Sequence, residues 1–252
     1  MQAGFTRFDR AVIAPLFAQE FRARGMVEAG LSGMGRAWTD HPVRPRSAML
    51  AVGDFLLCAG LCGREAAHQM RAWLREDRAW LIIAPQAWEA AIGPHESHER
   101  YAFDHSVQPE DDTLRQILRA LPEGVTFQVI DDAWYDRCLG EEWSRDFVSL
   151  FTREEYVQRG LGVLLMQDGL PVAGASSYAA YPGGIEVQVQ TREGHEGRGL
   201  ATLASAGLVL MAHERGLRAT WDAHSAASAR IAQKLGYRGR KAYTAYVLPE
   251  RV

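Results

Sequence analysis

The chain has 252 residues, with 28 basic and 31 acidic side chains and a formal net charge of −3. This length allows one large domain or two small ones, and 47% hydrophobic with 23% charged residues fits a soluble globular protein. The near balance of charge gives no reason to expect nucleic acid or an anionic membrane as a partner, and no long apolar stretch predicts a membrane span.

The start of the chain and the cysteines indicate a cytoplasmic protein. Charged side chains interrupt the short apolar run at the start, which therefore lacks the layout of a signal peptide. There are three cysteines, Cys58, Cys62 and Cys138. This odd, low number argues against a disulfide framework and favours a reducing compartment. No second pair joins Cys58 and Cys62 to complete a metal site, so small buried thiols are the favoured interpretation.

In the first half of the chain, the hydrophobic pattern predicts a mixture of strands and helices. The predicted elements, in chain order, are a buried pair of strands or a strand and turn (47–60), an amphipathic helix (64–77), a strand ending at a proline (78–85), a helix closed by proline and glycine (111–124) and a strand (125–131). A boundary between two parts of the chain is expected near residues 121–133, after the second helix.

Three histidines, His95, His98 and His105, lie in the segment GPHESHERYAFDH between these elements. The spacing of His95 and His98 permits a metal site, but the neighbouring charged side chains favour a solvated surface. We therefore expect no metal.

The second half begins with helical signals and continues with a regular series of elements. A capping box of Thr152 with Glu155 predicts the start of one helix, Asp168-Gly169 predicts a hairpin turn, and Ser225 predicts the N-cap of a later helix. The predicted elements are helical residues 141–151, a helix (152–160), two antiparallel strands (162–181), a strand (185–191), a helix (199–215), a strand (218–223), a helix (225–237) and a strand (241–248).

Three glycines, Gly194, Gly197 and Gly199, lie between a predicted strand and a predicted helix. The first amides of a helix have no partner inside it and carry the positive end of the helix dipole, so they favour an anion. Glycines let the backbone turn sharply and let a phosphate approach without meeting a Cβ atom. The pattern predicts a diphosphate held by amides from about His195 to Leu200, with a further charge from Arg198.

The same glycines also fit a tight turn between strand and helix with nothing bound, since such clusters match often by chance. Two other phosphate motifs are excluded by spacing. There is no GxxxxGK[ST] of a P-loop, and the loop is not a GxGxxG that follows the first strand of a βαβ unit.

Residues 141–248 resemble the GNAT superfamily of acyl-CoA N-acyltransferases. Its phosphate loop runs (Arg/Gln)-x-x-Gly-x-(Gly/Ala), and GHEGRG lies over it with Gly197 and Gly199 at the two small positions. The phrases GGIEVQVQTRE, GLAT and WDAHSAASARIAQKLGY are similar to a bacterial subgroup with an extra N-terminal region. VGDFLLCAG and ALPEGVTFQVID match that region more weakly.

The resemblance implies an α/β (α+β) fold with a mixed, mostly antiparallel sheet flanked by helices. It implies a smaller N-terminal α/β subdomain over residues 1–130 and an acyl-CoA-binding catalytic domain over residues 131–252. It also implies direct transfer of an acetyl group from acetyl-CoA, as cosubstrate and without a metal, to a small-molecule or peptide amine. A homodimer is compatible with this reading, with the N-terminal part shaping the acceptor site or a subunit interface.

The resemblance also implies the residues of the site. The pantetheine arm would pair with the strand before the loop, and the diphosphate would lie at the start of the helix. The implied cofactor residues are Val189, Gln190, Thr191, His195, Glu196, Gly197, Arg198, Gly199, Leu200, Ala201, Ser225 and Ser228. Glu186 and His224 are the candidates to take a proton from the amine, which must be neutral to attack.

Three of these residues have a structural alternative. Glu186 fits a solvated strand face, His224 a polar residue at a helix entry, and Ser225 a helix cap alone. Three positions depart from the superfamily pattern. Gly194 and Glu196 replace commoner cationic or polar residues of the loop, and Ala232 replaces a tyrosine that protonates the thiolate in many relatives. Tyr237, Tyr243 and Tyr246 are substitutes to consider for that acid.

These departures keep two other functions open. One is an acyl-CoA-binding sensor without turnover. The other is a transferase that acts on aminoacyl-tRNA through paired acyltransferase-like domains, against which the acidic balance of the chain counts. An assay of thiol release with a panel of amines separates the sensor from the enzyme.

Overall fold

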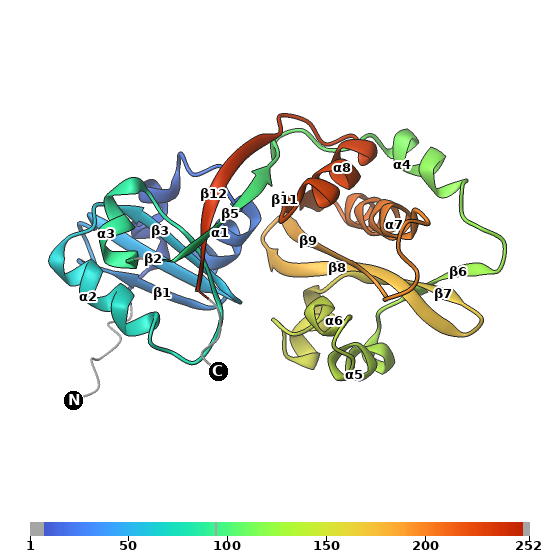
Figure 1. Cartoon of the computed structure of the whole chain (residues 1–252), viewed down its shortest axis with the longest axis horizontal. Coiled ribbons are helices and arrows are strands. Elements are labelled where there is room, and N and C mark those ends of the chain that lie inside the picture. Colours follow the sequence, from blue (N-terminus) through green and yellow to red (C-terminus); the bar gives the residue numbers. More distant parts are fainter. Residues whose placement is uncertain (1–7, 94, 249–252) are drawn as a thin grey trace. The chain divides into compact units, whose positions relative to one another are not determined.

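The computed structural model describes residues 8–93 and 95–248 (Figure 1). The first seven residues, on which the expectation about a signal peptide partly rests, lie outside this description, as does Pro94 of the histidine segment. The chain forms two compact units, one of Met1–Arg100 with Ala242–Val252 and one of Tyr101–Lys241. The sequence places its boundary near residue 130 instead, and its assignment of the catalytic domain stays a prediction.

The first unit contains a sheet with strands in the order β1-β2-β3-β4-β12, of which only β3 and β4 are parallel. Its core includes three tryptophans, Trp73, Trp80 and Trp88, buried against α2 and the sheet. Its elements are 3-10 helices at Arg10–Val12, Ala14–Phe17 and Gln86–Trp88, α1 (Arg24–Leu31), β1 (Arg36–Thr39), β2 (Ser47–Val52), β3 (Phe55–Gly60), α2 (Arg64–Trp73), β4 (Trp80–Ile83), α3 (Glu89–Ile92) and β12 (Lys241–Leu248). Strand β5 (Glu96–Ala102) contains the boundary between the units.

The second unit contains a five-stranded sheet in the order β10-β9-β8-β7-β6, antiparallel except for β10 with β9. Helix α7 crosses one face of this sheet, and α5 and α6 lie against the other (Figure 1). Its elements are α4 (Asp111–Leu118), β6 (Val125–Val129), α5 (Asp132–Gly140), a 3-10 helix η4 (Arg145–Phe147), α6 (Arg153–Arg159), β7 (Gly162–Gln167), β8 (Leu170–Tyr181), β9 (Gly184–Thr191), α7 (Leu200–Glu214), β10 (Arg218–Thr220), β11 (Asp222–Ala223) and α8 (Ala226–Leu235).

This architecture confirms the predicted fold class, a mixed sheet with mostly antiparallel strands and flanking helices. Three local predictions are also confirmed: a hairpin turn, a capping box and an N-cap. The hairpin turn between β7 and β8 has positive φ at both Asp168 and Gly169, as the sequence predicts for a tight turn. The capping box of Thr152 with Glu155 is present at α6, and Ser225 caps α8 by accepting a hydrogen bond from the amide of Ser228.

Two expectations about local structure were wrong, and a third was correct only in part. Residues 141–151 form only the short η4, because the helix lies just upstream at α5, where Asp131 caps it by accepting from the amide of Trp134. Residues 218–223 are two strands with different partners, divided at Trp221. The histidine segment contains β5, whose last residues Arg100–Ala102 are buried, although residues 96–99 are exposed as expected.

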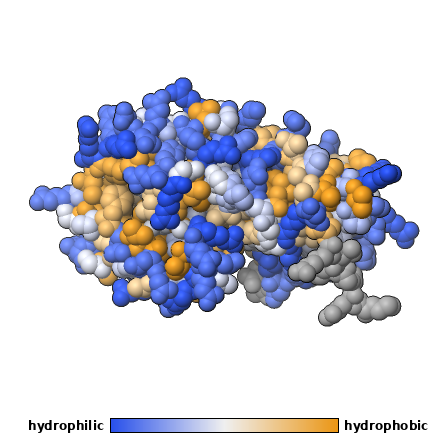
Figure 2. All heavy atoms as spheres, turned by 180° about the vertical axis from the view of Figure 1, so that it is seen from behind, coloured by the Kyte–Doolittle hydropathy of each residue, from blue (hydrophilic) through white to orange (hydrophobic). Residues whose placement is uncertain are grey.

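Figure 2 shows one face of the molecule, on which hydrophilic side chains predominate and hydrophobic ones form separate patches between them. The expectation that Cys58 and Cys62 are small buried thiols is confirmed for Cys58, which is buried, whereas Cys62 is half-buried; Cys138 is also buried. All three are free.

Candidate functional site

Strand β9 has two neighbouring strands at its start and only one at its end. Its antiparallel pairing with β8 continues to Thr191, but its parallel pairing with β10 stops at the pair of Glu186 and Thr220. Beyond Thr220 the chain leaves β9, and β11 pairs with residues 101–102 of β5 instead. Among the described residues, no strand covers the edge of β9 from Val187 to Thr191. We call this opening the fork.

Glu186 closes the narrow end of the fork. Its side chain is 4% exposed, so the interpretation of a solvated strand face is wrong at this position. One carboxylate oxygen accepts a hydrogen bond of 2.6 Å from the hydroxyl of Thr220, and the other accepts one of 2.7 Å from the amide of Asp222. The carboxylate therefore links β9 to the ends of β10 and β11. Its role as a base stays a prediction.

Tyr237 lies close to this network and is fully engaged in packing. Its hydroxyl donates a hydrogen bond of 2.8 Å to the carbonyl of Ala219. Burial, and then the negative charge of Glu186, hold the pKa of Tyr237 well above its usual range. Tyr243 and Tyr246, the other substitutes for the missing acid, belong to the first unit, where Tyr243 accepts from Arg100 and Tyr246 donates to Glu89.

The glycine loop connects the open end of the fork to α7. Gly194, Gly197 and Gly199 have φ angles of +83°, +74° and +78°, a region that L side chains rarely adopt, and a Cβ atom at any of them would meet only open space. Gly199 is the N-cap of α7, and no side chain caps the first turn. The loop thus exposes a helix start whose amides have no internal partner, beside a backbone that a ligand can approach closely.

A cluster of cationic and polar side chains lies on one side of this loop. The guanidinium of Arg198 contacts the Nδ1 atom of His195 at 3.1 Å and donates to the amide oxygen of Gln167 at 2.9 Å. A small cavity of about 210 Å³ adjoins the cluster, with walls formed by Gln167, Asp168, Leu170, Val172, Arg192, His195 and Arg198. Arg198 is exposed on the loop, as its predicted role requires, and Glu196 is also exposed.

The remaining predicted residues are placed unevenly. Val189, Gln190 and Thr191 lie along the open edge of β9, and Leu200 and Ala201 are the first residues of α7. The side chain of Ser225 caps α8, which explains a serine at this position without a ligand. The hydroxyl of Ser228, 7% exposed, accepts from the indole of Trp221. His224 is exposed and follows β11. The roles assigned to His224 and Glu186 stay predictions.

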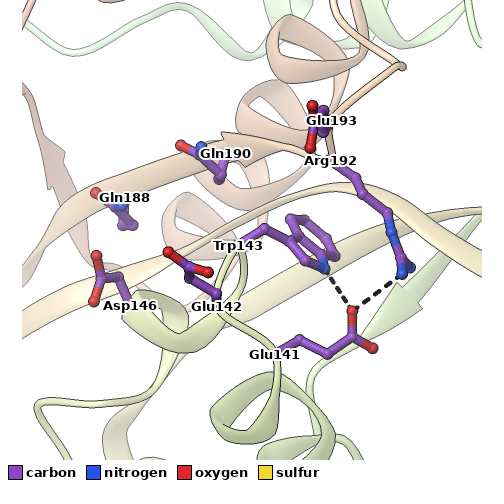
Figure 3. A pocket seen from close by; sticks show the side chains of 8 residues that line it. All are labelled: Glu141, Glu142, Trp143, Asp146, Gln188, Gln190, Arg192 and Glu193. Carbon is purple, nitrogen blue, oxygen red and sulfur yellow. Dashed lines mark hydrogen bonds and ion pairs between the residues drawn. The ribbon is translucent and has the colours of Figure 1, made fainter.

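A larger cavity, of about 640 Å³, lies against the face of β9 that bears Gln188 and Gln190 (Figure 3). We call it the acidic pocket. Its walls are formed by Glu141, Glu142, Trp143, Asp146, Gln188, Gln190, Arg192 and Glu193. The sequence does not predict this pocket, because the hydrophobic pattern of residues 141–151 indicates a helix, whereas the segment forms only the short η4. The concentration of acidic side chains around one tryptophan in EEWSRD was the available signal.

The described residues form neither a metal site nor a membrane-spanning helix. Over residues 8–93 and 95–248, no group of three or more His, Cys, Asp or Glu side chains is arranged to hold a metal ion. Within the same ranges, no helix is both long and apolar enough to cross a membrane.

The chain is similar to known proteins over almost its whole length. A family model described as GNAT acetyltransferase matches residues 14–246. A GCN5-related N-acetyltransferase-like protein from Streptococcus suis 89/1591 is 34% identical, with a TM-score of 0.85 and coverage of 94% of this chain and 97% of that one. A GCN5-related N-acetyltransferase from Kribbella flavida shares the fold at 20% identity and a TM-score of 0.56, with 95% of each chain covered. No protein of curated function matches the sequence.

Proposed function

The chain belongs to the GNAT acetyltransferase family, and from this premise we propose that it moves an acetyl group from acetyl-CoA to an amine. The observation that carries the proposal is the fork in front of the uncapped helix. The free edge of β9 leads directly through the glycine loop to the first turn of α7. An open strand edge followed by an uncapped helix start fits a long ligand with amide groups at one end and a diphosphate at the other.

The residues of the loop fit the diphosphate of coenzyme A. Uncapped amides and the helix dipole favour an anion at the start of α7, and the space above Gly197 and Gly199 admits one. Arg198 adds a side-chain charge next to the loop. The amides and carbonyls of β9 from Val187 to Thr191 are proposed to pair with the pantetheine arm. Coenzyme A, when bound, supplies an acetyl group activated as a thioester.

The proposed reaction forms one N–C bond and breaks the C–S bond of the thioester. The attacking nitrogen loses a proton, and the departing thiolate gains one. Glu186 and His224 stay the candidates to receive the proton from nitrogen, directly or through water. Ala232 is fully buried and supplies no acid, and the hydroxyl proton of Tyr237 is engaged with a carbonyl, so solvent is the proposed source of the proton for the thiolate.

The experiment is calorimetric titration of the purified full chain with acetyl-CoA, followed by an assay of thiol release with a panel of amines. Gly197→Ala would place a Cβ atom where the diphosphate approaches, and the loss of one or two hydrogen bonds to the anion should weaken binding about tenfold. Gly216→Ala is the matched control, since Gly216 has φ of +70°, also in open space, at the other end of α7.

Both variants should lose similar stability, about 1–2 kcal/mol, because each forces a side chain into the left-handed region. Only Gly197→Ala should lose affinity. Absence of acetyl-CoA binding to the unmodified chain at millimolar concentration would overturn the proposal. Binding without release of thiol for any amine would instead indicate an acyl-CoA sensor.

A further inference from the structure

The acidic pocket is a cavity of the size that small-molecule sites usually have, about 300–1,000 Å³. Gln188 and Gln190 bring β9 into its wall, and β9 is also the strand that forms the fork. The residues 141–146 supply the opposite wall (Figure 3). The cavity marks a site that adjoins the proposed cofactor strand, and the charges of its walls indicate what it accepts.

The charges of the wall are strongly one-sided. Four carboxylates and one guanidinium line the cavity, a formal excess of three negative charges. The guanidinium of Arg192 is paired with Glu141 at 3.4 Å, and the indole of Trp143 donates to the same carboxylate at 2.8 Å (Figure 3). Arg192 is thus neutralised by Glu141. Among the described residues, Glu142 and Glu193 form no hydrogen bond or ion pair with any other side chain.

Such a wall is a disadvantage for an acceptor with a single amine. Nearby carboxylates favour the charged form of an amine and raise its pKa, whereas only the neutral form attacks a thioester. The excess negative charge becomes useful when the acceptor carries a second nitrogen that stays protonated. That charge can remain with the carboxylates while the other amine loses its proton.

We propose that the acidic pocket receives the acceptor and selects a small aliphatic amine with a second positive charge, a diamine or polyamine. The inference rests on the proposed acetyl transfer and names the acceptor class for it. Glu142 holds the ammonium group that does not react, since Glu193 lies beyond the end of β9, on the side of the glycine loop.

The test compares acceptors that differ only in the second charge. Initial rates of acetyl-CoA-dependent thiol release are measured with 1,5-diaminopentane, 1-aminopentane and 5-amino-1-pentanol. We expect kcat/KM for the diamine to exceed that for either monoamine by roughly tenfold, as one charge-assisted hydrogen bond of ordinary strength supplies. The advantage should shrink between 50 and 500 mM NaCl, because the charges of the pocket are partly exposed. Equal kcat/KM for the three amines would overturn the inference and leave acetyl transfer standing.

Variants connect the preference to the pocket. Glu142→Gln should lower the ratio of diamine to monoamine kcat/KM several-fold. Glu154→Gln removes the same charge from an exposed position of α6 that does not line the cavity, and it should leave the ratio unchanged. A lysine-rich peptide turned over more than tenfold better than every diamine would contradict the assignment of a small acceptor.

A complete absence of turnover would contradict the proposed function, and binding then tests the pocket separately. Calorimetry with 1,5-diaminopentane and the holoprotein, with coenzyme A present, should show binding that Glu142→Gln weakens and Glu154→Gln does not. No detectable binding of the diamine at millimolar concentration would overturn the inference.

Discussion

The hydroxyl of Thr220 donates a 2.6 Å hydrogen bond to the carboxylate of Glu186, its direct partner in the register of β9 and β10. The same hydroxyl lies 2.9 Å from the carbonyl of Ile185. A hydroxyl has only one proton to donate. The shorter contact, to the charged carboxylate of Glu186, is the stronger hydrogen bond. This bond lies at the last paired position before the two strands separate, so it helps to define where the fork begins.

Thr220→Val is therefore expected to destabilise the second unit. The variant removes one hydrogen-bond donor from a buried carboxylate, at a cost of about 1–3 kcal/mol, whereas Thr220→Ser keeps the hydroxyl and should lose less than half of that. Urea unfolding followed by circular dichroism measures the difference. Equal stability of the Val and Ser variants would show that the hydrogen bond contributes nothing to the fork.

The function of Glu186 is open to a kinetic test. Both of its oxygens already accept hydrogen bonds from Thr220 and Asp222, which favours a positioning role at the fork over contact with the acceptor. Under that role, Glu186→Gln should lower kcat and stability, since an amide nitrogen must now face one of the two donors, but should leave the shape of the pH–rate profile unchanged. Loss of the acidic limb of kcat/KM in the variant would instead identify Glu186 as the base that the sequence predicts.

Arg198 is expected to act on the diphosphate of coenzyme A. Arg198→Ala should weaken binding of coenzyme A roughly fivefold, about 1 kcal/mol, which is modest because the side chain is exposed and its charge is screened. Dephospho-coenzyme A, which lacks the 3′-phosphate, should show the same loss. Arg119→Ala removes an exposed charge from the end of α4 and serves as control. A loss confined to the complete coenzyme would move Arg198 from the diphosphate to the 3′-phosphate.

Much of the second unit could be predicted because its signals are local. Glycines at positive φ, the capping box of α6, the tight turn at Asp168-Gly169 and the alternation of β9 each depend on a few adjacent residues. The predicted phosphate loop is another local feature, since the spacing of its glycines determines the turn before α7.

What the sequence could not predict depends on residues far apart in the chain. The separation of β10 from β11 arises because residues 222–223 pair with β5, which lies about 120 residues upstream. The burial of Glu186 depends on that same pairing. The acidic pocket is built from residues 141–146 and β9, and neither segment alone indicates a cavity. The amphipathic pattern of residues 141–151 correctly predicted that Phe147 and Phe151 are buried, but it wrongly predicted an α-helix there.

The stability of the second unit should depend on pH through Asp111 and His213. The Nδ1 atom of His213, near the end of α7, lies 2.8 Å from Oδ1 of Asp111 at the start of α4. The hydrogen bond from His213, with the charges of His213 and Arg115, holds the pKa of Asp111 below its ordinary value of 3.8. Because the folded state binds this proton less tightly than the unfolded state, the stabilisation is complete above about pH 4 and is lost as the pH falls through the lowered value.

Asp111→Asn should consequently lower the urea midpoint at pH 7, and the difference from the unmodified chain should shrink as the pH falls below 3.8 and through the lowered pKa of Asp111. The neighbouring Asp112→Asn is a close control, because Asp112 lies in the same first turn of α4 but has a fully exposed side chain 3.7 Å from Arg115. It removes the same charge from the helix start without the contact to His213, so its effect should be smaller. Equal effects of the two variants at pH 7 would assign the stabilisation to the helix dipole and would refute the link between α4 and α7 through His213.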